Sequence, residues 1–324
     1  MAKQKVAIVT GANTGIGRET ALALAKDDVK VFITCRDWDK GREAVKYIQD
    51  ACPTADVEII LLDLKTLDSV RRAAAEFKSK KLPLNILVNN AGSAMGKPWY
   101  TAEGVGGSAQ VNYLGAYAFT RLLEEELTLG APSRVVNVSS ITHRHASIET
   151  AVKFLKNFKA GLYAECKLAS VLFTHEAQRQ WQGKGIESAS VDPGAVWSDI
   201  WRRSKFNKPP FSWLLKVCYA PTWDGAKPVI YAATAPYDPP KKEKEPVRFF
   251  ARGCFASPLV TYPIPGGQLI HVIASFLDWP IRKFSRGAFC SQIKDVPAAP
   301  IAYDKNLASS LWKESAIIVG LDDK

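Results

Sequence analysis

Short apolar runs rich in β-branched residues alternate with helix-length stretches along the chain up to Gly194. Helical patterns such as RETALALAKDD and SVRRAAAEFKS separate the runs. Apolar strands that alternate with helices are typical of a parallel sheet covered on both faces. The pattern therefore predicts an α/β fold, a doubly wound parallel sheet of the Rossmann type with a C-terminal extension. Its six expected strands are KVAIVT, VKVFITC, DVEIILLDL, LNILVNN, SRVVNVSS and GIESASVDPG.

The alternation weakens after Pro193. Helices are expected over 224–234 and at NLASSLWKES, whereas the stretch from 236 to 246 is rich in Pro, Lys and Glu. We divide the chain accordingly into three parts. These are a dinucleotide-binding and catalytic domain at 1–235, an insertion of unassigned structure at 236–300, and a C-terminal helix and tail at 301–324.

Composition indicates the class of protein and the redox state of its cysteines. The 324 residues are 47% hydrophobic, which is ordinary for a globular core, and the six cysteines are scattered without a CxxC pair. Scattered cysteines indicate reduced thiols in an intracellular protein. The N-terminus enters an apolar strand pattern at Val6, which leaves no room for a secretory segment. We expect no metal site, and we interpret His143 and His145 as part of a solvated loop.

The formal charge of +11 predicts an anionic partner. A phosphorylated cofactor, an acidic lipid surface and nucleic acid all carry the required charge. Nucleic acid is the weakest of the three and is not expected, because the first 200 residues lack basic runs interleaved with stacking aromatics.

The sequence VAIVTGANTGIGRET places Gly11, Gly15 and Gly17 between the first expected strand and a helix. Glycines allow close approach of a pyrophosphate, and the helix N-terminus supplies unpaired N–H groups. The motif therefore predicts a dinucleotide phosphate site. Arg36 ends the second strand, where an acidic residue would favour NAD and a guanidinium suits the ribose phosphate of NADP. We expect NADP(H), with Arg18 beside the same phosphate; NAD(H) stays open because Asp37 could reach the ribose.

Tyr163 and Lys167 lie four residues apart in GLYAECKLAS. Four residues along a helix place both side chains on one face. The similar spacing of Tyr237 and Lys241 contains two prolines and cannot form a helical turn. Only the first pair can hold an ammonium against a phenol.

These motifs resemble those of the short-chain dehydrogenase/reductase family, and the resemblance extends over residues 5–200. It rests on TGANTGIG, DL at 63–64, NNAG, VNYLG, VNVSS, YAECK and DPG, in the order of the family. ITCRD, VVNVSSITH, KLASVLFTHEAQRQ and VDPGAVWSDI are similar to its retinol dehydrogenase-like branch. Gly106 and Gly107 depart from that branch, and we expect them to loosen the helix that leads to Asn112.

The resemblance implies a catalytic set of Asn112, Ser140, Tyr163 and Lys167. It also implies that Asp63 contacts the adenine and that Asn90 lies against a ribose. The full set of cofactor-binding residues expected is Gly11, Asn13, Thr14, Gly15, Ile16, Gly17, Arg36, Asp63, Leu64, Asn90, Ala91, Gly92, Tyr163, Lys167, Pro193, Gly194, Val196 and Ser198.

The chemistry explains these residue types. Carbonyl reduction needs a hydride from nicotinamide and a proton for the developing alkoxide. A phenol has a pKa of about 10, and we expect the Lys167 ammonium to lower the pKa of Tyr163. Ser140 would hold the substrate oxygen within reach of the phenol, and Asn112 would support a proton path behind Lys167.

The resemblance implies an NADP(H)-dependent oxidoreductase acting on the CH–OH group or carbonyl of a small hydrophobic substrate, a retinoid, steroid or polyprenoid. The alternative is a dinucleotide-binding regulatory protein of the same fold with little turnover. The aromatic and basic segment 198–216 could be a lid over the pocket, a peripheral membrane contact or ordinary packed surface. We expect a cytoplasmic location or a peripheral one on an organelle or lipid-droplet membrane, not secretion. A homodimer stays open.

Overall fold

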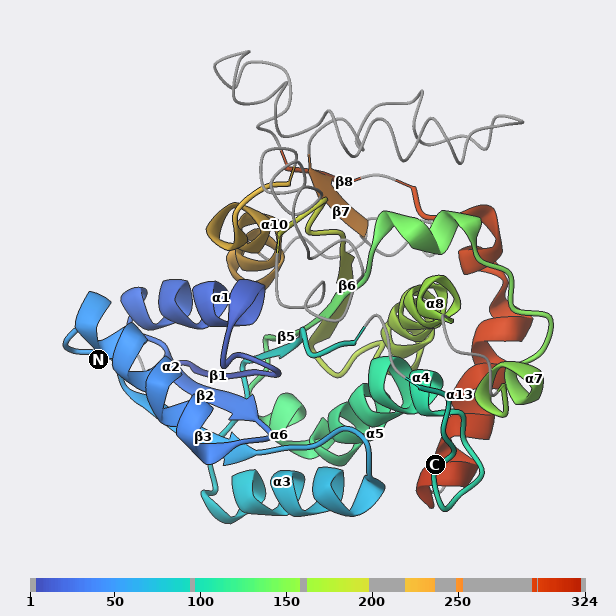
Figure 1. Ribbon diagram of the computed structural model, residues 1–324, viewed down its shortest axis with the longest axis horizontal. Helices are drawn as coiled ribbons and strands as arrows, with labels where there is room; N and C mark the ends of the chain where they lie inside the picture. The colour runs from blue at the N-terminus through green and yellow to red at the C-terminus, as the bar shows by residue number, and fades with distance from the viewer. Residues whose placement is uncertain are drawn as a thin grey trace.

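A computed structural model of the protein describes residues 4–93, 97–157, 162–197, 219–236, 249–252, 293–295 and 297–321. These residues form a single sheet with the strand order β3-β2-β1-β4-β5-β6-β7-β8 (Figure 1). The first seven strands run parallel, and β8 runs antiparallel to β7. The predicted doubly wound parallel fold is confirmed. The strands are β1 (Val6–Val9), β2 (Lys30–Cys35), β3 (Val57–Leu61), β4 (Ile86–Asn89), β5 (Ser133–Val138), β6 (Ile186–Val191), β7 (Phe249–Arg252) and β8 (Ile293–Asp295).

The last two strands were not predicted. β7 pairs with the end of β6 through Ser190 with Phe249 and Val191 with Phe250. Both strands are short, and they come from the part of the sequence to which the sequence analysis assigned no structure. Their pairing depends on β6 and on each other rather than on a local pattern, so the sequence alone did not reveal them.

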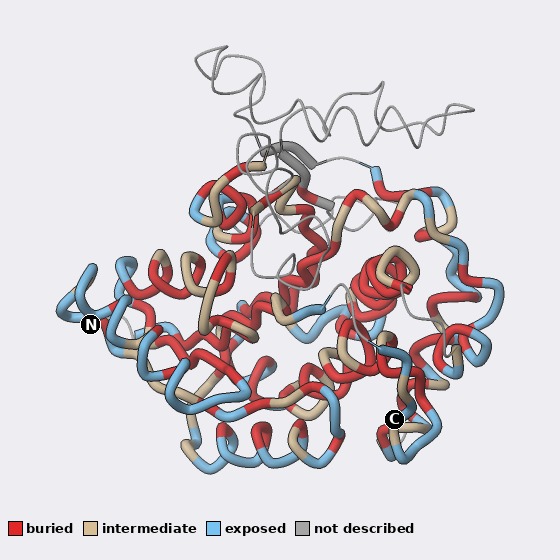
Figure 2. Tube along the Cα trace, in the orientation of Figure 1, coloured by how far each residue is buried: buried red, intermediate tan, exposed pale blue. Residues whose placement is uncertain are grey.

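Helices cover both faces of the sheet (Figure 1). Residues of α1, α2 and α10 share one buried apolar cluster, and residues of α3, α5, α8 and α13 share the other (Figure 2). The long helices are α1 (Gly15–Lys26), α2 (Trp38–Ala51), α3 (Leu67–Ser79), α5 (Gly115–Leu122), α8 (Tyr163–Gln180), α10 (Thr222–Thr234) and α13 (Lys305–Val319). The short ones are α4 (Gly107–Ala109), α6 (Glu124–Leu129), α7 (Ala151–Leu155), the π-helix η1 (Gln110–Leu114) and the 3₁₀ helices η2 (Ile141–His145) and η6 (Pro300–Tyr303).

Helix α8 is buried on every side over most of its length. All positions from Cys166 to Ala177 are buried, which requires partners all round the helix. The sheet covers one side, and α13, which contains the predicted helix NLASSLWKES, covers another. The ring of Trp312 in α13 stacks on that of Phe173 in α8, with centroids 5.8 Å apart. Among the described residues, no helix combines the length and the apolar character needed to cross a bilayer.

Candidate active site

The expected site residues gather where the strands end at their carboxyl termini. The strand order reverses between β1 and β4, which pair directly although β2 and β3 intervene in the sequence. Parallel sheets bind ligands in the crevice at such a switch point. The glycine-rich segment follows β1, NNAG follows β4, Ser140 follows β5, and Pro193 follows β6.

The loop between β1 and α1 has the form of a phosphate cradle. Gly11 has φ +63°, and a Cβ there would lie 2.9 Å from Ala91 Cα. A Cβ on Gly17 would lie 2.4 Å from Asn90 Nδ2, so a side chain fits at neither position. The N-terminus of α1 carries no acidic residue in its first turn, and Thr14 makes no side-chain cap. The unpaired N–H groups of the first turn of α1 and the positive end of the helix suit a pyrophosphate.

Asn90 and Ala91 hold this cradle against the end of β4. Asn90 Nδ2 donates to Thr10 O at 2.8 Å, and the Ala91 N–H donates to Thr10 Oγ1 at 3.0 Å. The Asn90 amide therefore has a structural role beside the expected contact with a ribose. Asn13, Thr14, Gly15 and Ile16 lie in the same loop and in the first turn of α1.

The remaining expected cofactor residues follow β3 and β6. Asp63 accepts a hydrogen bond from Lys65 N at 3.1 Å, and Leu64 is buried, with its carbonyl accepting from Gln110 Nε2 at 2.8 Å. Because the Leu64 side chain is buried, only its backbone atoms could contact a cofactor. After β6 come Pro193, Gly194 and the buried Val196, which forms a bridge with Ala220 just before α10. Ser198 and the segment 198–216 lie outside the described residues.

The four expected catalytic residues lie together. Lys167 Nζ is 5.4 Å from the centroid of the Tyr163 ring, and Tyr163 is hydrogen-bonded to Ser140. Asn112 lies in the π-helix η1, and its Oδ1 accepts from Ser93 N at 2.7 Å. A Cβ on Gly92 would lie 3.2 Å from Asn112 Oδ1 and 3.8 Å from Lys167 Nζ. Gly92 thus lies close to both the asparagine and the lysine, and NNAG adjoins the catalytic set.

Comparison with known proteins agrees with this geometry. The sequence profile of the family described as "short chain dehydrogenase" matches residues 5–208. The chain belongs to the short-chain dehydrogenase/reductase family. It lies in the retinol dehydrogenase-like branch and is an oxidoreductase. It is 40% identical to retinol dehydrogenase 11 of Mus musculus over 232 residues, which cover 71% of this chain and 73% of that protein.

Two further relatives extend over nearly the whole chain. Retinol dehydrogenase 13 of Mus musculus is 32% identical over 328 residues, covering 98% of this chain and 84% of that protein. A crystal structure of a putative uncharacterized protein from Mycobacterium Paratuberculosis is 25% identical, with a TM-score of 0.69, and covers 99% of this chain and 95% of that one. The similarity thus extends beyond the residues that carry the family motifs.

The acidity of Tyr163 in this dehydrogenase/reductase differs from the expectation. Burial raises the pKa of the phenol above its usual value, the nearby Asp192 carboxylate raises it further, and only the hydrogen bond with Ser140 opposes the rise. The Lys167 ammonium, expected to lower this pKa, is not among the causes of its shift. Its Nζ donates to Val138 O at 2.7 Å instead, and burial lowers the pKa of Lys167 to about 8.

The glycine pair before Asn112 makes close contacts that the sequence did not reveal. A Cβ on Gly107 would lie 2.1 Å from the Trp99 ring, and a Cβ on Gly106 would lie 2.0 Å from Asn157 O. Gly106 N donates to Leu155 O, and Gly107 N donates to Trp99 O, each at 2.8 Å. The absence of side chains lets Trp99 and the segment after α7 pack closely on the start of α4.

The interpretation of His143 as part of a solvated loop is wrong. Its side chain is 0% exposed, whereas His145, two residues on, is exposed. Sequence reasoning also missed Asp192, which is 1% exposed and acts on both Tyr163 and Lys167. Asp192 stands in the quoted DPG motif, whereas the burial of His143 depends on residues far away in the chain.

Two buried histidines should make stability depend on pH. Burial is the main cause that lowers the pKa of His143 to about 3 and that of His175 to about 4. Unfolded histidines have a pKa of about 6.5, so the unfolded chain binds more protons at mildly acid pH, and stability falls as pH drops from about 6.5 toward 4. Each histidine contributes up to about 1.4 kcal/mol per pH unit. We therefore expect the free energy of unfolding of His175→Gln, measured in urea between pH 6.5 and 5, to fall with pH less steeply than that of the unaltered protein, by about 1 kcal/mol per pH unit. The same pH dependence in both proteins would contradict this.

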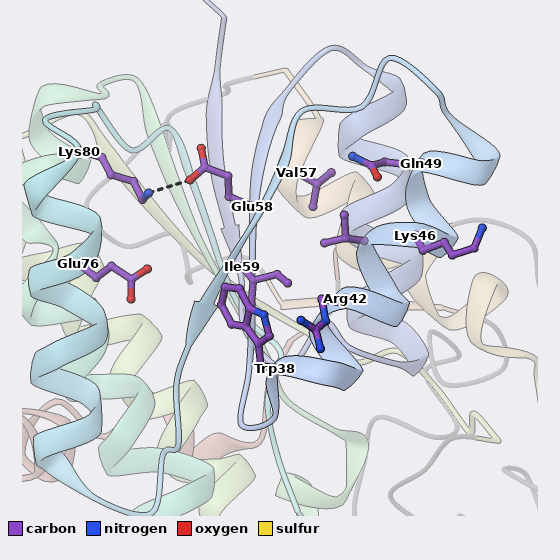
Figure 3. A pocket seen from close by; sticks show the side chains of 10 residues that line it. Trp38, Arg42, Lys46, Gln49, Val57, Glu58, Ile59, Glu76 and Lys80 are labelled. Atoms are coloured by element: carbon purple, nitrogen blue, oxygen red, sulfur yellow. Dashed lines mark hydrogen bonds and ion pairs between the residues drawn. The ribbon is translucent and has the colours of Figure 1, made fainter.

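A separate hollow of about 420 Å³ lies at the far edge of the sheet, between α2, β3 and α3 (Figure 3). Lys80 and Glu58 form an ion pair of 2.7 Å across it. β2, β1 and β4 separate β3 from β5, which leads to Ser140. We assign this hollow no part in catalysis. Its lining residues are Trp38, Arg42, Val45, Lys46, Gln49, Val57, Glu58, Ile59, Glu76 and Lys80.

Proposed function

We propose that the protein is an NADP(H)-dependent oxidoreductase that transfers a hydride between nicotinamide and a small hydrophobic alcohol or carbonyl compound. The observation that carries the proposal is the grouping of Ser140, Tyr163 and Lys167 next to the glycine cradle. The cradle would hold the pyrophosphate, and Gly92, Tyr163 and Lys167 would adjoin the nicotinamide half. NADPH supplies, when bound, the hydride for the carbonyl carbon.

Tyr163 would give the proton that carbonyl reduction requires. A raised pKa keeps the phenol protonated at neutral pH, which is the form that a general acid needs. Ser140 would orient the substrate oxygen, because its hydroxyl is hydrogen-bonded to Tyr163. In the oxidation direction the same phenol would have to accept a proton as phenolate, which burial and Asp192 both disfavour. These groups therefore suit reduction better than oxidation at neutral pH.

Lys167 and Asn112 would support the phenol from behind. With a pKa of about 8, the lysine is mostly protonated at pH 7 and can still exchange a proton near neutrality. The Asn112 side chain is fixed at both ends, since its Nδ2 donates to Ser108 O at 3.0 Å and its Oδ1 accepts from Ser93 N. Asn112 would thus keep the surroundings of the ammonium in place during turnover.

The preference for NADP(H) rests on the residues after β2. Asp37 caps α2 by accepting from Lys40 N at 3.1 Å, so its carboxylate is already engaged. Arg36 is exposed and makes no ion pair within the described part of the chain. The Arg18 guanidinium lies 3.7 Å from the centroid of the Tyr47 ring, at the start of α1. Two arginines at this end of the crevice would attract the ribose phosphate of NADP.

Arg36→Asp should reverse the cofactor preference. Loss of a charge-assisted hydrogen bond should raise the KM for NADPH about 10–100-fold, and the new carboxylate should favour the ribose hydroxyl of NADH. Steady-state kinetics with both cofactors checks this. Arg42→Asp, at an exposed arginine already paired with Asp39, is the matched control and should change little. An unaltered KM for NADPH in Arg36→Asp would refute the assignment of Arg36.

The names of two relatives support the proposed substrate class. Retinol dehydrogenases 11 and 13 carry a retinoid alcohol in their names, which supports a small hydrophobic substrate for this chain. NADPH oxidation measured with retinal, a steroid ketone and a polyprenal tests the proposal. Tight NADPH binding without turnover on such a panel would instead indicate a regulatory dinucleotide-binding protein.

A further inference from the structure

The imidazole of His143 joins Ser140 to a segment from the C-terminal region of the chain. Its Nδ1 lies 2.7 Å from Ser140 O, and its Nε2 lies 3.0 Å from Ala299 N. The side chain is 0% exposed. Both ring nitrogens are therefore engaged inside the protein, one on each side of the ring.

The partners determine which nitrogen carries the proton. A backbone carbonyl only accepts a hydrogen bond, so Nδ1 must be protonated toward Ser140. A backbone N–H only donates, so Nε2 must offer its lone pair to Ala299. The ring is consequently neutral and in a single tautomer. It cannot flip without breaking both hydrogen bonds.

The segment on the far side of the ring, Pro297–Tyr303, is itself fixed in place. The Tyr303 hydroxyl accepts from Ala298 N at 2.8 Å, and the Arg144 guanidinium donates to Pro297 O. The centroid of the Tyr303 ring also lies 4.9 Å from the centroid of the His175 ring in α8. Ala299 is thus held between contacts to η2 and to the catalytic helix, which gives its N–H a defined direction.

On the near side, the contacts concern the geometry of Ser140. The Ser140 carbonyl accepts from His143 N at 3.1 Å as well as from the imidazole, and Ser140 Oγ accepts from Thr142 N at 3.3 Å. Its hydroxyl is also hydrogen-bonded to Tyr163. The carbonyl and the hydroxyl belong to one residue with extended backbone (φ −162°, ψ 153°), so a shift of the Ser140 backbone that follows loss of the imidazole contact would carry the hydroxyl away from the phenol.

We propose that His143 is a positioning residue for catalysis, which holds Ser140 in register with Tyr163, and that the segment Pro297–Tyr303 sets the orientation of the His143 ring. This inference rests on the proposed function, since it concerns the same site. It makes a segment remote in sequence from the family motifs a working part of the active site. The competing view is that His143 only fills space in the core.

Three variants separate the two views. His143→Ala removes both hydrogen bonds. His143→Asn restores an amide N–H at the position of Nδ1, facing Ser140. Ala299→Pro removes the N–H that donates to His143 Nε2. The backbone should tolerate this change, because Ala299 already has φ −60°, close to the value that proline imposes. The matched control is His145→Ala, at an exposed histidine of the same 3₁₀ helix.

The measurements are kcat and KM with NADPH and retinal, NADPH affinity by calorimetry, and Tm for each variant. A displaced hydroxyl should lower kcat about 10–100-fold in His143→Ala and about 5-fold or more in Ala299→Pro, while NADPH affinity changes less than about two-fold. His143→Asn should recover most of the lost kcat, and His145→Ala should match the unaltered protein.

Two results would overturn the inference without touching the proposed function. One is a lowered Tm with kcat within about two-fold of the unaltered enzyme in both His143→Ala and Ala299→Pro. The other is a His143→Asn variant no more active than His143→Ala, which would indicate packing rather than the hydrogen bond. If the unaltered protein itself turns over no carbonyl compound, the proposed function fails first and this inference falls with it.

Discussion

Replacing Tyr163 by phenylalanine should lower kcat for carbonyl reduction by about 10²–10⁴-fold, which is the range that general acid catalysis contributes. The hydroxyl is the only group that the substitution removes, and the aromatic ring remains in place. NADPH affinity should therefore change by less than about two-fold, because glycine-loop contacts supply the phosphate binding. Pre-steady-state NADPH oxidation with retinal measures the first effect, and calorimetric titration with NADPH measures the second.

A second tyrosine provides the comparison for this experiment. Tyr231→Phe makes the same chemical change on α10, where the side chain is 44% exposed and its ring packs against Phe250. We expect kcat in that variant to equal that of the unaltered protein. Full activity of Tyr163→Phe would mean that another group delivers the proton, and the catalytic assignment would have to be abandoned.

Replacing Trp312 by alanine should lower the free energy of unfolding by about 3–5 kcal/mol, the usual cost of deleting a large aromatic side chain from a core. Trp312 is 5% exposed and contacts three aromatic rings, those of Tyr117, Phe173 and Trp181. The Arg121 guanidinium lies over its ring at 4.3 Å. Its deletion leaves a cavity between α13 and α8 that rigid helices fill only in part.

Urea unfolding followed by circular dichroism measures this loss. Trp223→Ala is the control, because Trp223 is 51% exposed on α10 and its removal should cost less than about 1 kcal/mol. The slope of the transition should stay the same in both variants. A Trp312→Ala protein as stable as the Trp223→Ala protein would show that α13 contributes little to the core.

Local patterns account for the part of the fold that the sequence predicted. Each of the first six strands is a short run that contains buried apolar residues and is bounded by helix-length segments. Within the glycine loop, within NNAG and within the Tyr163–Lys167 pair, the residues of each motif lie close together in sequence. Their geometry follows from a strand end or a helical turn, so the sequence could place them. The clustering of Asn112, Ser140, Tyr163 and Lys167 also follows once the sheet is parallel.

The features that were missed depend on distant contacts. His143 looks solvated because its neighbours Arg144 and His145 are polar, and its cover is a segment more than 150 positions later. From the sequence, Gly107 predicts only a weak helix start. Its close contact with the Trp99 ring becomes apparent only in the structure. The shift in the pKa of Tyr163 likewise reflects burial and Asp192, neither of which can be read from the YAECK spacing.

The burial of α8 by α13 has a consequence for the order in which a newly made chain can mature. Tyr163 and Lys167 leave the ribosome early, but the helix that carries them keeps an apolar side uncovered until residues 305–319 have been synthesised. Such a surface invites chaperone binding or self-association in the interval. Ribosome-bound intermediates that stop short of α13 should therefore hold a complete set of catalytic side chains and yet be the most aggregation-prone form of the protein.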